Sequence, residues 1–282
     1  MRLREISAVN VQQTVKQLVL QASFCIGPDV LAALQRARDQ EPSELGRSVL
    51  DMILENHRIA CEERLAICQD TGMALVFIEL GQDVHIQGDL CAAVNRAVEM
   101  AYEEGYLRKS VVADPLFDRR NTETNTPALI YIDIVPGDQV GILVSPKGFG
   151  SENMSALAMK TPGDGVEGVK GFVVQTVKDA GPNPCPPTIV GVGIGGTADR
   201  AALLAKKATL RTVGQPHPDT RYARLEEELL ERINQLGIGP AGLGGRTTAL
   251  AVHVEFFPTH IGALPVAVNL CCHAARHAQA TL

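Results

Sequence analysis

The sequence contains no run of basic residues and no stripe of lysine or arginine along any segment. Its 26 Lys and Arg residues are outnumbered by 32 Asp and Glu residues, which gives a formal net charge of −6 at pH 7. Nucleic-acid-binding proteins usually concentrate positive charge on one surface, so this pattern argues against a nucleic-acid partner. A few converging cations would still suffice to bind a small anion.

The sequence also lacks the signals of membrane insertion and export. No apolar run approaches the roughly 20 residues that span a bilayer, and the N-terminal residues 1–6 show neither a signal-peptide core nor an acid-poor transit segment. We therefore expect a cytoplasmic protein without a membrane association. In a reducing compartment, the seven scattered cysteines are expected to serve packing, catalysis or metal ligation rather than disulfides.

There is no low-complexity linker and no internal repeat, and 282 residues can bury a substantial core. We expect one domain over residues 1–282 of the mixed α/β (α+β) class, with a helical N-terminal third followed by mixed sheets flanked by helices. Apolar periodicity and turn residues predict the individual elements. They are helices near 11–22, 30–37, 45–56, 89–104, 166–180, 198 onward and 221–236, a strand at 73–80, a hairpin over 128–146, strands near 188–192, 247–257 and 264–270, and a short C-terminal helix.

Three cysteines stand where loops or element ends are expected. Cys68 lies between a predicted helix and a strand, Cys185 lies among three prolines that exclude a helix, and Cys272 follows an apolar strand. Cys61 and Cys91 fall within helical patterns instead, which favours buried, inert thiols.

The spacing of these cysteines is a weak metal signal. Zinc sites normally show paired ligands such as C-x₂-C, and electron-transfer clusters usually take four cysteines. Three ligands on a four-iron cluster would leave one iron without a protein thiolate, and that iron could act as a Lewis acid. Spacing alone favours plain buried cysteines over such a site.

Six ordered stretches carry a resemblance to a known family. They resemble the class I fumarate hydratases and the related L(+)-tartrate dehydratases, from about residue 10 to residue 280. The stretches are Ile-Cys-Gln-Asp-Thr-Gly (67–72), Lys-Gly-Phe-Gly-Ser-Glu-Asn (147–153), Asn-Pro-Cys-Pro-Pro (183–187), Gly-Ile-Gly-Gly-Thr (193–197), Gly-Leu-Gly-Gly-Arg-Thr-Thr-Ala-Leu (242–250), and Pro-Thr-His-Ile-Gly-Ala-Leu-Pro-Val-Ala-Val-Asn (258–269) with the following Cys-His-Ala-Ala-Arg-His (272–277).

The resemblance implies a [4Fe-4S] cluster held by Cys68, Cys185 and Cys272, with the fourth iron open to substrate. Two positions depart from the family pattern. Cys271 stands where the family more often has Gln, and Cys272 is favoured as the ligand because it directly precedes the His-Ala-Ala-Arg-His string. Phe149 stands where a glycine is common.

The resemblance also implies roles for the residues around the first ligand. Gln69 and Asp70 are expected beside the cluster and the bound dicarboxylate. Arg108 matches a family arginine that pairs with a substrate carboxylate, a task that suits the planar guanidinium fork. Without the resemblance, Arg108 would be interpreted as a solvated residue just after a helix.

Three further residues are assigned in the same way. His260 matches a histidine near the substrate, where a hydrogen bond to Asp70 would make it a proton donor near neutral pH. Gly150 and Ser151 are expected to let a backbone N–H approach the anion closely. A lone histidine on a strand pattern would otherwise be interpreted as structural.

The implied reaction is the reversible hydration of fumarate to L-malate by acid–base elimination. In the family, the catalytic base and further carboxylate-binding cations belong to a second domain or to a separate β subunit, and we find no such domain in this sequence. We therefore expect an α subunit that is inactive alone and assembles with two β chains into a heterotetramer with two α chains. Alternatives are the α subunit of an L(+)-tartrate dehydratase and, outside the enzymes, an iron–sulfur redox sensor or scaffold.

A nucleotide-binding site is a further alternative, because residues 191–196 match G-x-G-x-x-G after a predicted strand. About 20 residues further on, however, the sequence reaches Arg211 and a polar turn, where a dinucleotide site needs a strand ending in an acid. The glycines more simply indicate close backbone packing, with the next helix N-terminus facing an anion.

Overall fold

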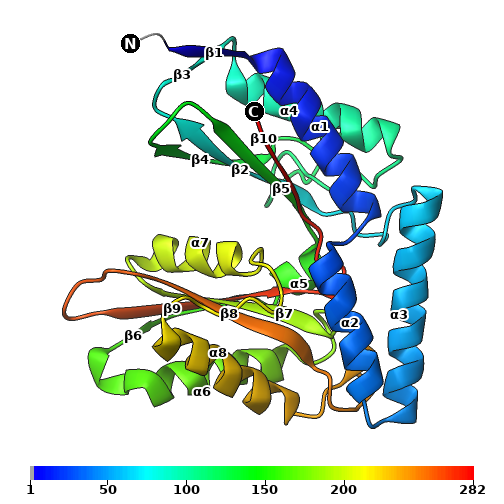
Figure 1. Ribbon diagram of the computed structural model, residues 1–282, viewed down its shortest axis with the longest axis vertical. Helices are drawn as coiled ribbons and strands as arrows, with labels where there is room; N and C mark the ends of the chain where they lie inside the picture. The colour runs from blue at the N-terminus through cyan, green and yellow to red at the C-terminus, as the bar shows by residue number, and fades with distance from the viewer. Residues whose placement is uncertain (1–2) are drawn as a thin grey trace. The chain divides into compact units, whose positions relative to one another are not determined.

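The computed structural model describes residues 3–282, and the chain forms two compact units (Figure 1). Unit 1 comprises the residues up to Gly27 together with Asn56–Gly148 and Arg276–Leu282. Unit 2 comprises Pro28–Glu55 and Phe149–Ala275. Both units combine helices with a sheet, so the expected mixed α/β class is confirmed. The expectation of a single domain stays a prediction, because compactness alone does not show whether the units fold separately.

Unit 1 is built on a four-stranded sheet with the order β10-β5-β2-β4. Its strands are β2 (Met73–Gly81), β4 (Leu129–Val135), β5 (Val140–Lys147) and β10 (Ala278–Thr281), and a separate parallel pair is formed by β1 (Arg4–Ser7) and β3 (Val84–Gln87). β2 runs parallel to β4 and antiparallel to β5.

The predicted hairpin over 128–146 is therefore wrong, because β2 lies between its two strands. Residues 74–78 of β2 are buried without interruption, whereas β4 keeps most of its residues exposed or half-buried. A strand that is apolar on both faces gains most from the interior of a sheet, so β2 separates β4 from β5. Pairing order is set by this burial rather than by chain proximity.

The predicted C-terminal helix is also wrong. Residues 278–281 form β10, which pairs antiparallel with β5. Alanine-rich segments favour a helix in isolation, but the backbone groups along the edge of β5 offer hydrogen bonds that outweigh this weak preference.

Helix α1 (Ala8–Phe24) supplies much of the core of unit 1. It packs against α4 (Leu90–Glu104), and its residues Val11, Val15 and Val19 are fully buried. The stretch Ala8–Gln40 is apolar enough to pass a length and composition test for a membrane span, yet half of its most apolar window is buried inside the fold. Because its apolar face is already occupied, α1 is a core helix.

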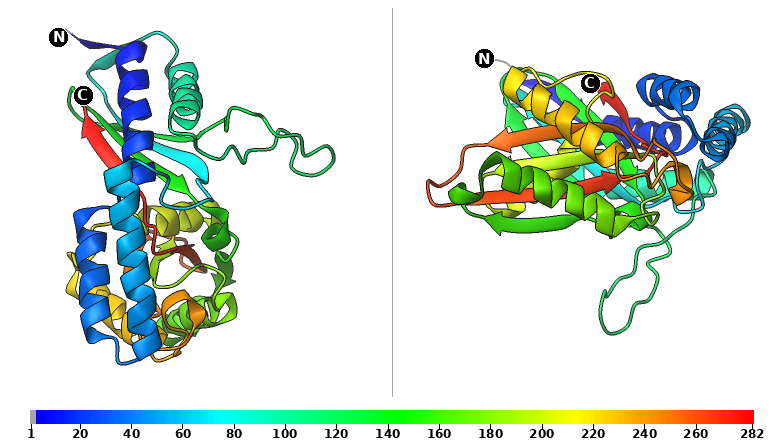
Figure 2. Two further views of the ribbon diagram at one scale, coloured as in Figure 1. Left: turned by 90° about the vertical axis from the view of Figure 1, so that its right-hand side faces the viewer. Right: turned by 90° about the horizontal axis from the view of Figure 1, so that it is seen from below.

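The segment between α4 and β4 extends away from the sheet of unit 1 as an ordered arm, which is visible in Figure 2. Its two sides are joined by backbone hydrogen bonds from Ala113 to Arg120 (2.8 Å) and from Thr122 to Val111 (2.9 Å). Arg108, a predicted substrate-binding residue, lies at the start of this arm. The order of the arm therefore fixes the position of the Arg108 backbone.

Unit 2 is built on a four-stranded sheet with the order β6-β9-β7-β8 and helices on both faces (Figure 1). Its strands are β6 (Ala156–Lys160), β7 (Thr188–Gly195), β8 (Ala249–Phe257) and β9 (Leu264–Cys271). Its helices are α5 (Phe149–Glu152), α6 (Gly165–Ala180), α7 (Ala198–Ala208), α8 (Thr220–Asn234), α2 (Pro28–Gln40) and the first part of α3 (Glu44–Glu63), with short 3₁₀ turns at Pro162–Asp164 and Pro240–Gly242.

The glycines of β7 allow α7 to lie directly on the sheet. A Cβ added at Gly191 would come within 2.1 Å of the Ala205 carbonyl oxygen, and one added at Gly193 within 2.0 Å of the Ala201 carbonyl oxygen. The prediction that these glycines serve close backbone packing is confirmed.

Two cysteine predictions are wrong. Cys25 and Cys61 form a disulfide with their Cα atoms 4.7 Å apart, because the end of α1 lies beside the last part of α3. Cys61 and Cys91 are exposed rather than buried, since both lie on the solvent side of their helices. Among the described residues, five cysteines lie outside the disulfide: Cys68, Cys91, Cys185, Cys271 and Cys272.

We predict that Cys61→Ser lowers the free energy of unfolding by about 2–4 kcal/mol, because the disulfide closes a loop with a sequence separation of 36 residues and so restricts the unfolded chain. Denaturant unfolding of oxidised protein measures the change, with Cys91→Ser as the exposed control. A reductant that leaves wild-type stability unchanged would contradict the prediction.

Candidate functional site

The loop that carries Cys68 is fixed at its start by two hydrogen bonds. The Ile67 backbone N–H donates to the Ser23 carbonyl (3.0 Å), and the Asn56 side-chain amide donates to the Ile67 carbonyl (3.0 Å). The Asp70 backbone N–H then donates to Cys68 Sγ (3.4 Å). Cys68 is half-buried at the predicted turn between α3 and β2.

The end of the same loop is held by buried polar side chains. The Tyr102 hydroxyl donates to the Thr71 carbonyl (2.7 Å), and the Asn125 amide donates to the Gly72 carbonyl (3.0 Å). Burial raises the pKa of Tyr102 well above its usual value, so the hydroxyl keeps its proton near neutral pH. Gly72 has φ +69°, and an added Cβ would lie 2.3 Å from the Lys147 carbonyl oxygen. Only glycine fits there.

The predicted substrate-binding residues of unit 1 gather around this loop. The Asp70 side chain is half-buried, and its carboxylate accepts a hydrogen bond from the Gly72 N–H (3.0 Å). This bond holds the carboxylate against the backbone of its own loop. The Thr71 hydroxyl donates to the Arg108 carbonyl (2.8 Å), so the root of the arm is tied to the same loop. The side chains of Gln69 and Arg108 are exposed.

Two buried cations near Asp70 were not predicted as site residues. Lys147 and Arg276 are each 3% exposed. A Cβ placed on Gly148 would lie 3.2 Å from Arg276 Nη2 and 3.2 Å from Asp70 Oδ2, so these two side-chain ends are close neighbours. Within residues 3–282, Arg276 Nε and Nη1 are buried without a hydrogen-bond partner. Arg276 could have been found from the sequence, because it lies in the His-Ala-Ala-Arg-His string that follows Cys272.

In unit 2, the loops of the two remaining predicted ligands meet. Cys185 has φ +54°, and its backbone N–H donates to the Pro182 carbonyl (3.0 Å). The His273 N–H donates to the Cys185 carbonyl (3.3 Å), which joins the segment after Cys272 to the Cys185 loop. A Cβ on Gly150 would lie 3.5 Å from the Asn183 carbonyl, so α5 lies against the same loop.

The neighbouring cysteines Cys271 and Cys272 have different surroundings. Cys271 ends β9, pairs with Ile189 and is buried in the sheet, whereas Cys272 follows the strand and is half-buried. The greater exposure of Cys272 supports it as the ligand of the pair.

Ser151, a predicted substrate-binding residue, lies in α5 and is almost fully buried.

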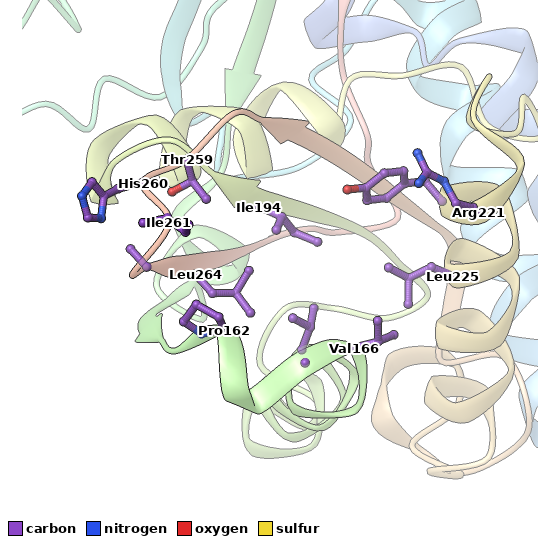
Figure 3. A pocket seen from close by; sticks show the side chains of 13 residues that line it. Pro162, Val166, Ile194, Arg221, Leu225, Thr259, His260, Ile261 and Leu264 are labelled. Atoms are coloured by element: carbon purple, nitrogen blue, oxygen red, sulfur yellow. The ribbon is translucent and has the colours of Figure 1, made fainter.

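His260 lies between β8 and β9 in unit 2, with an exposed ring whose Nδ1 accepts from the Gly262 N–H (3.1 Å). It lines a cavity of about 550 Å³. Figure 3 shows His260 at the edge of this cavity, among mainly apolar side chains such as Val166, Ile194 and Leu264. Asp70 belongs to unit 1. The predicted hydrogen bond between His260 and Asp70 therefore stays a prediction.

The donor chemistry of the three predicted ligands fits an iron–sulfur cluster. Cys68, Cys185 and Cys272 lie on loops, form no disulfide and are at least partly exposed. No group of three His, Cys, Asp or Glu side chains within residues 3–282 is placed to hold a single metal ion. Convergence of the three thiols stays a prediction, because Cys68 belongs to unit 1 and the other two to unit 2.

A partly buried cysteine, a carboxylate and a buried guanidinium gathered on an ordered loop make the Cys68 region a candidate active site. The chain belongs to the fumarate hydratase (fumerase) family, whose model matches residues 12–281. It is therefore a hydro-lyase by family, which confirms the resemblance seen in the sequence.

Relatives of known name match nearly the whole chain. A protein of Methanocaldococcus jannaschii, provisionally named L(+)-tartrate dehydratase subunit alpha, is 44% identical over 96% of this chain and 96% of its own length. The L(+)-tartrate dehydratase subunit alpha of Escherichia coli strain UTI89 is 35% identical, and that of strain K12 is 34% identical, each over 96% of this chain and 92% of the relative.

We predict that Gly72→Ala lowers the free energy of unfolding by about 3 kcal/mol or more, because the new Cβ adds a backbone collision to the strain of a positive φ. Gly137→Ala is the matched control, since Gly137 has φ +105° with nothing within 4 Å of an added Cβ, and should cost about 1–2 kcal/mol. Equal losses in denaturant unfolding would show that the contact with Lys147 does not constrain the loop.

Proposed function

We propose that this chain is the α subunit of a two-subunit class I fumarate hydratase, which interconverts fumarate and L-malate with a [4Fe-4S] cluster. The observation that carries the proposal is the Cys68 loop, where a half-exposed thiol, the Asp70 carboxylate and the buried Arg276 guanidinium lie together in one ordered unit. A purely structural cysteine would not need this arrangement of charges.

Cys68, Cys185 and Cys272 would hold the cluster. When bound, it supplies an iron without a protein thiolate, which is a Lewis acid for the hydroxyl and carboxylate oxygens of the substrate. Gln69 and Arg108 have exposed side chains, and the Arg108 guanidinium would bind a substrate carboxylate in bidentate fashion.

Other residues of the chain would orient the dicarboxylate and move protons. The buried Arg276 guanidinium lies beside Asp70, where its charge stabilises the carboxylate. Gly150 and Ser151 lie in α5 against the Cys185 loop, where backbone N–H groups can face an anion. His260 would donate a proton to the substrate hydroxyl, which then leaves as water, with Asp70 as its proposed hydrogen-bond partner.

A partner chain completes the proposed enzyme. The names of the relatives, subunit alpha, support a β subunit, which would supply the base that removes the C3 proton of malate and further carboxylate-binding cations. We propose two α and two β chains, located in the cytoplasm. A redox sensor is disfavoured, because a sensor does not need the charged side chains around Asp70.

L(+)-tartrate is the second candidate substrate. The relatives at 44% and 35% identity carry that activity in their names, whereas the description of the family names fumarate hydratase. Tartrate differs from malate by one hydroxyl group, so the same carboxylate-binding residues serve both substrates. Turnover with malate, fumarate and tartrate, measured on the complex with its β subunit, decides between them.

We predict about four irons and four sulfides per chain after anaerobic reconstitution, because three thiolate ligands hold a four-iron cluster. Cys68→Ser, Cys185→Ser and Cys272→Ser should each lose most of the iron, while Cys91→Ser, an exposed cysteine on α4, should keep it. Iron and sulfide analysis measures this directly. If the wild type bound no iron, or if all variants bound it equally, the proposed cluster would be refuted.

A further inference from the structure

Glu41, in the turn between α2 and α3, is a buried carboxylate that the proposed reaction does not use. It is 1% exposed, and an isolated buried carboxylate costs several kcal/mol unless its oxygens are satisfied. Its oxygens accept four hydrogen bonds, all within unit 2. The donors are the N–H groups of Ser43 (3.2 Å), Arg246 (2.9 Å) and Thr247 (2.7 Å) and the Thr247 hydroxyl (2.7 Å).

These bonds keep the carboxylate ionised. Burial by itself would raise the pKa of Glu41, but the bond from the Thr247 hydroxyl and the backbone bonds from Arg246, Thr247 and Ser43 outweigh it, so the pKa is lowered. Charge-assisted hydrogen bonds of this kind are stronger than neutral ones. Glu41 is thus a fixed anchor for the segment that donates to it.

The anchored segment is a glycine-rich loop, whose own hydrogen bonds run from the Gly242 N–H to the Gly239 carbonyl (3.0 Å) and from the Gly244 N–H to the Ile238 carbonyl (2.9 Å). Gly239, Gly242, Gly244 and Gly245 all have positive φ, a conformation that glycine loses much entropy to maintain. A Cβ on Gly245 would come within 2.7 Å of Glu41 Oε1, so the loop is closely fitted around the carboxylate.

The opposite side of this loop supports the turn that presents Cys185. The Ala241 N–H donates to the Pro186 carbonyl (2.8 Å), directly after Cys185. An added Cβ on Gly242 would lie 2.3 Å from Pro182 Cβ, so the loop also backs the residues before Cys185. The chain of contacts therefore runs from Glu41 through the glycine-rich loop to both ends of the Cys185 turn.

We infer that Glu41 is a positioning residue for Cys185: its carboxylate holds the glycine-rich loop 239–248 as the platform that fixes the geometry of this thiol. The expected effect of Glu41 on iron retention rests on the proposed function. Its expected effect on the position and reactivity of the Cys185 thiol does not. A role limited to general stability would affect every part of unit 2 alike, and a positioning role affects Cys185 selectively.

The variant Glu41→Gln tests this inference, because it removes the charge and turns one amide NH₂ toward the loop donors. In metal-free protein, hydrogen exchange of the Ala241 N–H should become at least about tenfold faster, as expected for losing a charge-assisted bond. The rate of Cys185 alkylation by iodoacetamide should change by about threefold or more. After reconstitution, iron should be lost in air faster than from the wild type.

Glu226→Gln is the matched control. Glu226 is also buried in unit 2 and accepts from Arg211 Nη1 (2.6 Å), the Val254 N–H (2.8 Å) and the His217 N–H (3.0 Å), none of them in the glycine-rich loop. Its variant should alter overall stability without the changes at Ala241 and Cys185. Thr247→Val, which removes a single bond to Glu41, is the milder variant if Glu41→Gln does not fold.

The outcomes separate the two ideas. Unchanged exchange and alkylation in Glu41→Gln, or equal changes in Glu226→Gln, would overturn the positioning role. Faster exchange at Ala241 with unaltered alkylation and iron retention would also overturn it, because the loop would then move without affecting Cys185. A wild type that binds no iron would refute the proposed function alone, since exchange and alkylation are measured on metal-free protein.

Discussion

The site depends on hydrogen bonds from buried polar side chains to loop backbone. A cysteine reaches a metal through a single side-chain carbon, so its backbone must be placed accurately, yet loops lack the ladder of bonds that orders strands and helices. In unit 1, Tyr102 and Asn125 bond to the carbonyls that follow Cys68. In unit 2, Glu41 orders the glycine-rich loop beside Cys185. Loss of such a bond leaves a buried group unsatisfied, which makes these loops costly to move.

Most of the longer helices and the three ligand loops could be predicted from the sequence. Helix α4 begins after Asp89, whose side chain caps the Ala92 N–H, and ends at Gly105, as capping chemistry indicates. The prolines around Cys185 exclude a helix, and residues 181–187 between α6 and β7 form none, although Cys185 itself has φ +54° rather than an extended backbone. Local rules suffice where neighbouring residues decide the conformation, and ordered family motifs identify loops because their chemistry recurs in fixed strings.

Other features depend on contacts between distant residues, which a single sequence does not show. The place of β2 between β4 and β5 follows from burial on both faces, and the strand β10 replaces a predicted helix because it pairs with β5. The Cys25–Cys61 disulfide needs two helix ends to be adjacent. The charged cluster of Asp70 and Arg276 joins residues more than 200 positions apart, so neither spacing nor periodicity could reveal it.

Mössbauer spectroscopy of protein reconstituted anaerobically with ⁵⁷Fe, with and without malate or tartrate, tests for the open iron. We expect a four-iron cluster in which one iron differs from the other three and alone changes its isomer shift when the dicarboxylate binds, because it lacks a thiolate ligand. Four similar irons that ignore both dicarboxylates would contradict an open iron, and with it the proposed hydro-lyase site.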